Sequence, residues 1–256
     1  MDLRMNKTLS NGYTSNSQKA RVLTEQWVSD NMFCPRCGNI TIAHFENNKP
    51  VADFYCPHCA NQFELKSKCG TAIDTVNDGA YTTMIERILS YDNPDFLFMT
   101  YTKPEWTVQS LLFVPKHFFT PSIIKQRKPL SPHARRAGWV GCNIVLKSIP
   151  KIGKIPIVED GEECDRNRVF QKVAIANTLL VKDINARGWL FDVLSCIEDI
   201  NSSTFTLSEV YIYENRLQTL HPNNHNIRPK IRQQLQLLRD LGIIEFVNRG
   251  EYRKVM

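Results

Sequence analysis

Two pairs of cysteines in the first quarter of the chain have the spacing of a metal site. Cys34 and Cys37 form one Cys-x2-Cys motif, and Cys56 and Cys59 form a second one after 18 intervening residues. Each motif can fold as a knuckle that turns two thiolates toward one ion. Four thiolates complete the tetrahedral shell of Zn²⁺ and leave no position for a reacting water. We therefore expect a structural Zn²⁺ site, with redox-active thiols as the alternative.

Three charged residues flank the second motif and have the types that hydrolytic chemistry needs. Asp53 precedes the motif, and Glu64 and Lys66 follow it. Because side chains alternate along a strand, Glu64 and Lys66 share one face, and a hairpin centred on His58–Cys59 sets Asp53 opposite Glu64. Two carboxylates at that distance repel each other unless a cation lies between them, and Mg²⁺ is a hard ion that binds carboxylates and phosphate. Taken alone, the pattern is more often an ion cluster on a surface hairpin.

The modest net charge of +6 hides a strong segregation of charge along the chain. From Trp106 to Val158 there is no Asp or Glu, whereas the same segment carries nine Lys or Arg residues interleaved with aromatic side chains. Solvated faces normally mix the two signs, so a single-sign segment favours a surface that faces phosphates. Its candidate DNA contacts are Arg135, Arg136 and Trp139, and an ordinary solvated face is the alternative.

The composition is that of a globular protein, since 42% of the residues are hydrophobic and 23% are charged. No apolar run approaches the roughly 18 residues of a membrane helix, and the polar segment Met1–Ser10 lacks the apolar core of a secretory signal. We expect a cytoplasmic protein with reduced thiols and no membrane contact. The remaining cysteines are expected to be small buried hydrophobes: Cys69, Cys142, Cys164 and Cys196.

Helical and strand patterns alternate over residues 1–182, which predicts an α/β (α+β) domain after an unpacked tail of 14 residues. The expected elements are helices over Ser15–Asp30, over Asn77–Leu89 and from Asp165 onward, and strands at Val51–Cys56, Gln62–Lys66, Phe96–Tyr101, Val108–Val114, Asn143–Leu146 and Ile155–Val158. Over residues 183–256 three helical patterns, from Ala186, over Leu207–Leu220 and over Ile227–Leu241, precede two short strands. These are the parts of a winged helix, so we expect a second domain there.

The last of these helices carries an apolar stripe beside a polar one, which is typical of a helix that reads DNA. The polar stripe consists of Arg228, Arg232, Gln236 and Arg239. Arginine pairs with guanine and glutamine with adenine at the edges of the major groove. Arg249 and Arg253, in and beside the expected wing turn, are candidate phosphate contacts. A solvated Arg/Gln face on an ordinary helix is the alternative.

The segment Pro50-Val-Ala-Asp53 with Glu64-Leu-Lys66 resembles the signature of the PD-(D/E)XK nucleases. The resemblance implies that Asp53, Glu64 and the backbone carbonyl of Leu65 bind Mg²⁺, and that Lys66 orients or deprotonates the attacking water. These residues would be the catalytic ones in a Mg²⁺-assisted attack of water on a phosphodiester. Glu25 is a candidate for the auxiliary acid that some members have.

A narrower resemblance, to the DpnI-like family of methyl-directed type II restriction endonucleases, extends over nearly the whole chain. It is carried by Ser15–Trp27, Pro50–Lys68, Gln126–Asn143 and Ile231–Lys254. It implies a PD-(D/E)XK domain with an embedded four-cysteine zinc site, followed by a winged helix. It also implies a monomeric, Mg²⁺-dependent enzyme that cuts double-stranded DNA at GATC sites carrying N6-methyladenine, with both domains reading the site.

Two other functions remain open at this point. One is a zinc-containing winged-helix regulator that binds DNA without nuclease activity, and the other is a nuclease of repair or recombination. In either nuclease Asp53, Glu64 and Lys66 would form a hydrolytic centre, whereas in the regulator they would not. Their geometry therefore distinguishes the hypotheses.

Overall fold

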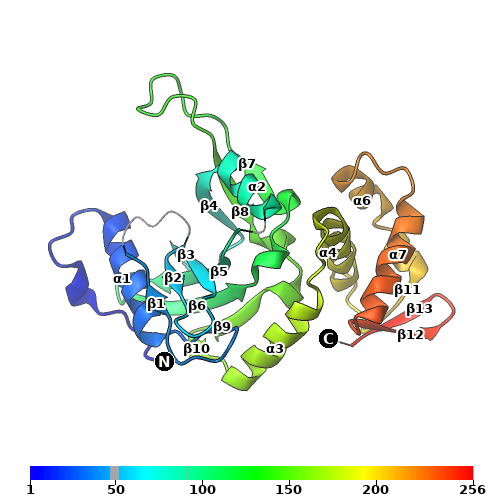
Figure 1. Cartoon of the computed structure of the whole chain (residues 1–256), viewed down its shortest axis with the longest axis horizontal. Helices are drawn as coiled ribbons and strands as arrows, with labels where there is room; N and C mark the ends of the chain where they lie inside the picture. Colours follow the sequence, from blue (N-terminus) through cyan, green and yellow to red (C-terminus); the bar gives the residue numbers. More distant parts are fainter. Residues whose placement is uncertain (47–51, 91, 256) are drawn as a thin grey trace.

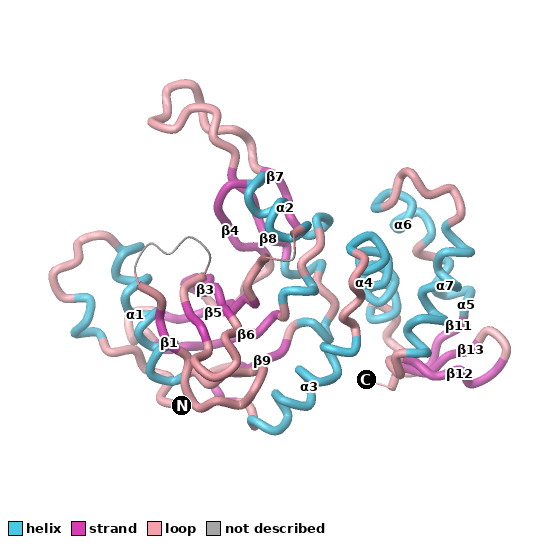
Figure 2. The backbone as a smooth tube through the Cα atoms, in the orientation of Figure 1, coloured by secondary structure: helices cyan, strands magenta, loops and turns pink. Residues whose placement is uncertain are grey.

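The centre of the structure is a mixed sheet of seven strands, of which β5 (Asp95–Thr102) is buried over almost its whole length. The computed structural model describes residues 1–46, 52–90 and 92–255 (Figures 1 and 2). The strands of this sheet are β1 (Ala43–His44), β2 (Phe54–Tyr55), β3 (Gln62–Cys69), β5 (Asp95–Thr102), β6 (Thr107–Val114), β9 (Ile155–Glu159) and β10 (Glu162–Glu163). They are ordered β1-β2-β3-β5-β6-β9-β10, with β3 and β5 parallel and the other neighbours antiparallel.

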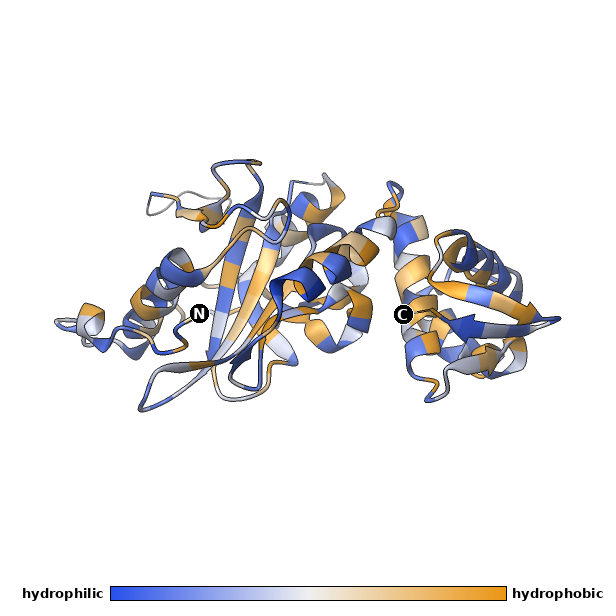
Figure 3. Cartoon of the chain, turned by 90° about the horizontal axis from the view of Figure 1, so that it is seen from below, coloured by the Kyte–Doolittle hydropathy of each residue, from blue (hydrophilic) through white to orange (hydrophobic). Residues whose placement is uncertain are grey.

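The predicted strands Phe96–Tyr101 and Val108–Val114 are confirmed as β5 and β6. In β5 all residues except Thr102 are buried, as a run of apolar residues requires when both faces of a strand are covered. The inner strands carry hydrophobic stretches (orange in Figure 3). The strand expected at Val51–Cys56 is shorter, since β2 comprises two residues; Pro50 and Val51 lie outside the described residues.

A second, smaller sheet consists of β4 (Thr75–Ala80), β7 (Ile124–Gln126) and β8 (Gly141–Val145), in the order β4-β8-β7. Helix α2 (Tyr81–Leu89) follows β4 directly, with Met84 and Ile88 buried as predicted. The prediction that this helix begins at Asn77 is wrong. Asn77 pairs with Asn143 of β8, and this long-range pairing overrides the local helical pattern.

Residues 127–140, the link from β7 to β8, form a long projection that we call the basic arm (green, top of Figure 1). Its two limbs are joined by backbone hydrogen bonds from Leu130 N–H to Trp139 O and from Gly138 N–H to Leu130 O. The predicted basic loop is therefore a hairpin-like arm built on the small sheet.

Helices α1 (Asn16–Asn31) and α3 (Arg166–Thr178) pack on the large sheet, α1 against β1 and β3, and α3 against β9. The Asp165 side chain caps α3 by accepting the Arg168 N–H, as expected from its position before the helical pattern. The expectation of an unpacked N-terminal tail is wrong. Met5 is buried, because its N–H bonds to Trp106 O and its neighbour Arg4 forms a bridge with Thr107.

The C-terminal body contains α4 (Ile184–Glu198), α5 (Leu207–Tyr211), α6 (Glu214–Leu220) and α7 (Ile227–Asp240), with a sheet of β11 (Thr204–Thr206), β12 (Ile244–Asn248) and β13 (Glu251–Lys254). The helix predicted over Leu207–Leu220 is split into α5 and α6, and β11 was not predicted. Strand β13 lies between β11 and β12, so the last two strands form the expected wing. Helices and wing together are a winged helix-turn-helix.

The two bodies meet through aromatic stacking and one carboxylate. Phe118 stacks on Phe191 of α4 at 4.6 Å between ring centroids. The Glu198 carboxylate, at the end of α4, accepts the backbone N–H groups of Lys151 and Ile152. Short 3-10 helices supply these contacts: η2 (Lys116–Phe118) and η5 (Lys151–Gly153), with η1 (Lys7–Ser10), η3 (Pro121–Ile123) and η4 (Leu146–Ser148) elsewhere. The fold class is therefore mixed α/β followed by an α-helical winged domain, as predicted.

Candidate active site and four-cysteine centre

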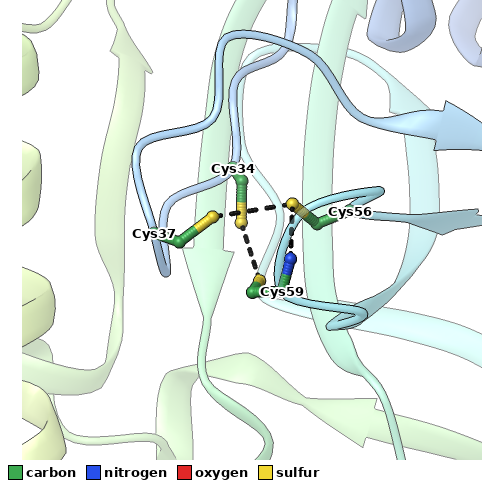
Figure 4. Close-up of side chains that lie close together, drawn as sticks. All are labelled: Cys34, Cys37, Cys56 and Cys59. Atoms are coloured by element: carbon green, nitrogen blue, oxygen red, sulfur yellow. Dashed lines mark hydrogen bonds between the residues drawn. The ribbon is translucent and has the colours of Figure 1, made fainter.

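The four predicted cysteines converge on one point at the edge of the large sheet (Figure 4). Cys34 Sγ lies 3.7 Å from Cys59 Sγ, and Cys37 Sγ lies 3.6 Å from Cys56 Sγ. Four sulfurs at tetrahedral corners, each about 2.3 Å from zinc, are about 3.8 Å apart. The side chains therefore fit a tetrahedral four-thiolate ion.

Both knuckles are built by the same backbone turn. The Cys34 N–H bonds to Asn39 O and the Cys56 N–H bonds to Asn61 O, while Cys34 O and Cys56 O each accept the N–H four residues later. The residue at that fourth position has a positive φ, +80° at Gly38 and 58° at Ala60. The first knuckle follows α1 and the second is the turn between β2 and β3, so one ion would join the helix to the hairpin.

Two of the other cysteines do not match their predicted role. Cys142 and Cys196 are buried, but Cys69 is exposed and Cys164 is half-buried. Cys69 is the last residue of β3, where the burial of the strand ends.

The hairpin that carries the acidic pair has the predicted register. Phe54 pairs with Phe63 and Tyr55 with Gln62, which sets Asp53 opposite Glu64. The ladder continues at Asp53, whose N–H donates to Phe63 O and whose Oδ2 accepts the Leu65 N–H at 2.7 Å. Asp53 is thereby fixed beside the strand that bears the other two groups.

Glu64 and Lys66 point to the same side of β3, as the alternation of side chains predicts. Lys66 Nζ lies 2.6 Å from Glu64 Oε1 and 2.5 Å from Asp78 Oδ1. Asp53, Glu64, Leu65 and Lys66 all line a cleft of about 590 Å³ between β3 and α1. The structure therefore brings the predicted hydrolytic residues together in one open space.

The electrostatics of this cluster favour a bound cation. Burial raises the pKa of Glu64, although Lys66 opposes the shift, and Glu64 Oε2 is buried without a hydrogen-bond partner. Burial tends to lower the pKa of Lys66, but Glu64 and Asp78 outweigh it and hold that pKa above its ordinary value. Arg87 Nη1 is the ion-pair partner of this oxygen, at 3.8 Å, and a buried carboxylate oxygen without a hydrogen bond is a position that a hard cation can complete. The residues present thus fit a divalent ion.

The cleft also holds charged residues that the motifs did not reveal. Glu25, which the resemblance offered as an auxiliary acid, lines it from α1 and faces Arg21 and His44. Lys68 and Lys103 line it as well and give it positive charge along its walls. Alternation along β3 could have indicated Lys68, which is two residues after Lys66, but no sequence pattern connects Lys103 to this strand.

The three predicted DNA contacts on the basic arm, Arg135, Arg136 and Trp139, are not among the residues that line this cleft. The Arg136 guanidinium lies over the Trp139 ring, 4.7 Å from its centroid, and Arg135 is exposed. A Cβ at Gly141 would approach the Trp139 ring to 2.8 Å, so glycine is needed where the arm joins β8.

Helix α7 separates its apolar and polar stripes as predicted. Its buried side includes Ile227, Ile231, Leu235 and Leu238, and its exposed side includes Arg228, Arg232, Gln236 and Arg239. In this DNA-free structure Arg228 pairs with Glu214 and Arg232 donates to the Tyr211 hydroxyl. On the wing, Arg249 is exposed and Arg253 pairs with Glu245.

These features define a class, a mixed α/β nuclease-like domain joined to a DNA-binding helix-turn-helix domain. Residues 1–182 match the family model described as DpnI, Dam-replacing family, and residues 185–254 match the one described as Dam-replacing HTH domain. The chain belongs to the DpnI, Dam-replacing family. Membership implies a nuclease that acts on DNA. Within the described ranges, no helix is long and apolar enough to cross a bilayer.

Proposed function

We propose that this protein is a type II restriction endonuclease that needs Mg²⁺ and cleaves double-stranded DNA at GATC sites carrying N6-methyladenine. The observation that carries the proposal is the grouping of Asp53, Glu64 and Lys66 along one cleft, on a hairpin whose turn is a cysteine knuckle. Family membership supports it. We propose that it acts in the cytoplasm as a monomer, with residues 1–182 as the catalytic domain and residues 183–256 as the recognition domain.

The Mg²⁺ ion would be held by Asp53, Glu64 and the backbone carbonyl of Leu65. Mg²⁺ at such a site supplies Lewis-acid activation of the phosphate and lowers the pKa of a bound water. Asp53 is oriented for this role by its bond to the Leu65 N–H, and Glu64 retains one oxygen, Oε2, that accepts no hydrogen bond. Lys66, between two carboxylates at the cleft, would orient the attacking water toward the phosphorus.

The four cysteines would hold a structural Zn²⁺. The second knuckle is the turn of the hairpin; Asp53 lies directly before its first strand and Glu64 lies on its second. An ion that ties this turn to the end of α1 would fix the separation of the two carboxylates, which is what a metal-dependent hydrolytic centre requires.

Methyl dependence is supported by the presence of two separate DNA-reading surfaces. One buried methyl group contributes roughly 0.8 kcal/mol, and a methyl-sized difference in a pocket gives about 1–3 kcal/mol of discrimination. Strict dependence therefore calls for two methyl groups read together, or for two independent readings. Arg135, Arg136 and Trp139 on the basic arm would supply one reading.

The winged domain would supply the other reading. Arg228, Arg232, Gln236 and Arg239 would contact base edges from α7, while Arg249 and Arg253 would contact phosphates. Base-edge contacts would select the sequence, and phosphate contacts would set the orientation of the domain on the duplex.

The test is digestion of one plasmid prepared from a host that methylates adenine in GATC and from a host that does not. With Mg²⁺, the proposal expects fragments from the methylated plasmid alone, and no fragments when EDTA replaces the metal. A DNA-binding regulator would leave both preparations intact. A repair or recombination nuclease would prefer branched or unmethylated DNA, and either result would refute the proposal.

A further inference from the structure

The ammonium group of Lys66 is held from two different sheets. Glu64 approaches it from β3 of the large sheet at 2.6 Å, and Asp78 approaches it from β4 of the small sheet at 2.5 Å. The Asp78 side chain is only 9% exposed. A buried carboxylate is costly unless it is paired, so the contact of Asp78 with Lys66, which lines the cleft, is a structural feature rather than a chance surface pair.

A β-bulge lies directly after Asp78. Asp78 pairs with Cys142 and Ala80 pairs with Gly141, which leaves Gly79 as the extra residue of the bulge. Bulges are frequent beside active sites. Asp78 is thus the last residue of β4 before the regular pairing with β8 is interrupted.

Asp78 is separate from the proposed ion-binding group. In the parts of the chain that the structure describes, only the four cysteines bring three or more ligand atoms within 4.8 Å of one another. Asp53, Glu64 and Asp78 therefore do not form one three-carboxylate site. Asp78 would therefore affect the proposed reaction through its ion pair with Lys66.

Glu64 has two tasks in the proposed function that compete with each other. As a ligand of a divalent ion it gives up electron density to that ion, and the ion repels the neighbouring ammonium group. Its hold on Lys66 weakens as a result. A second carboxylate that does not bind the ion then becomes the group that keeps the lysine at the cleft.

Asp78 also connects Lys66 to the base of the basic arm. Its partner Cys142 follows Gly141, where the arm joins β8, and the Tyr81 N–H bonds to Val140 O. Backbone pairing of β4 with β8 therefore links the strand that bears Asp78 to the base of the arm.

We propose that Asp78 is the positioning residue for Lys66: it holds the lysine at the cleft when Glu64 binds a metal ion, and it ties the lysine to the sheet that bears the DNA-contacting arm. This inference rests on the proposed function.

The test compares Asp78→Asn, which keeps the shape of the side chain and removes its charge, with the control Asp74→Asn. Asp74 is an exposed aspartate four residues earlier in the same segment. Three quantities are measured: the single-turnover cleavage rate on methylated plasmid, the Kd for the same DNA with Ca²⁺ in place of Mg²⁺, and the melting temperature. We expect Asp78→Asn to lower the cleavage rate by about 10–100-fold, the range for a group that orients a reacting one. The Kd should stay within about twofold, Asp74→Asn should behave as the parent does, and Asp78→Glu should recover part of the rate.

A readout that needs no catalysis is the ζ-ammonium signal of Lys66 in a ¹H–¹⁵N spectrum of the zinc-loaded protein without Mg²⁺, assigned by its absence in Lys66→Ala. Two carboxylate bonds slow the exchange of these protons with water, so we expect the signal in the parent and in Asp74→Asn. It should be lost in Asp78→Asn.

Several results would overturn the inference. One is a folded Asp78→Asn protein that cuts at the parental rate and keeps the signal. Another is a defect that higher Mg²⁺ concentration removes, because Asp78 would then be an ion ligand. A third is a melting temperature of Asp78→Asn that lies below the temperature of the cleavage assay, with no recovery of the cleavage rate in Asp78→Glu. That result would make the role of Asp78 structural. If the parent cuts neither plasmid, the proposed function fails, and the ammonium signal alone decides whether Asp78 holds Lys66.

Discussion

The first prediction concerns Asp95, a fully buried carboxylate that joins both cysteine knuckles to the large sheet. Its oxygens accept two bonds from the Arg36 guanidinium, at 2.7 Å each, and one each from Asn61 Nδ2 and the Lys116 N–H. Arg36 lies in the first knuckle and Asn61 follows the second. Asp95 thus receives four bonds at the first residue of β5.

Asp95→Asn would remove the charge with almost no change of volume and would place an amide donor against other donors. Removing one partner of a buried pair costs about 3–5 kcal/mol, because the Arg36 guanidinium, which is 20% exposed and keeps its bond to Asn177 Oδ1, loses its carboxylate. For a chain of this size that corresponds to a fall in melting temperature of about 6–20 °C. The knuckles would also lose their common anchor, so a chelator should extract zinc faster from the variant.

The assay is thermal unfolding together with the rate of zinc release to a chromogenic chelator. The control is Asp92→Asn, an exposed aspartate three residues earlier, which should change stability by less than about 0.5 kcal/mol. The double variant Arg36→Met with Asp95→Leu should recover much of the loss, because no buried charge then remains. A melting temperature of Asp95→Asn within about 2 °C of the parent would refute the reasoning.

Four further predictions follow from the site and its surroundings. Lys66→Ala should abolish cleavage of methylated plasmid while the Kd measured with Ca²⁺ is retained, and an active variant would remove Lys66 from the mechanism. Cys56→Ser should lower the melting temperature and the zinc content measured by metal analysis, since three thiolates hold the ion less tightly; normal folding without metal would show that the site is not structural. Arg232→Ala should weaken binding to methylated GATC duplex by about 1–3 kcal/mol relative to a scrambled duplex in a competition assay, whereas equal losses on both would indicate a phosphate contact. Burial lowers the pKa of His117 from 6.5 to about 4, aided by Arg36 and opposed by its bond to Ala176 O. The unfolded chain then binds the extra proton first, so the free energy of unfolding should fall by up to about 3 kcal/mol as the pH drops from 6.5 to 4. In urea titrations His117→Gln should show a smaller fall, and an identical pH dependence would contradict the assignment.

The hairpin that carries Asp53, Glu64 and Lys66 was predictable from sequence because its geometry is local. The second cysteine motif defines the turn, which sets the register, and the alternation of side chains sets the face of Glu64 and Lys66. The same holds for α7, where a helical period of apolar residues separates the buried stripe from Arg228 and Arg232. In both cases, residues of one hairpin or one helix carry the signal.

The start of α2 was predicted wrongly because a non-local pairing decides it. Residues 77–80 have a pattern compatible with a helix, but β8 pairs with them from more than 60 positions away along the chain. That error also concealed Asp78, which a helix starting at Asn77 would place on its first turn rather than opposite Lys66.

The sequence by itself determined which residues can bind a metal ion, which two carboxylates and lysine share a hairpin, and which helix presents arginines to a partner. Spacing and periodicity suffice for these, because covalent geometry limits where neighbouring side chains can point. Only the tertiary structure decided that Asp78 meets Lys66 and that Asp95 lies beneath Arg36. Those pairs are separated by 12 and 59 positions and lie on different elements. Their contacts exist because packing of the apolar strands brings those elements together, and no local pattern encodes which charged residues then meet.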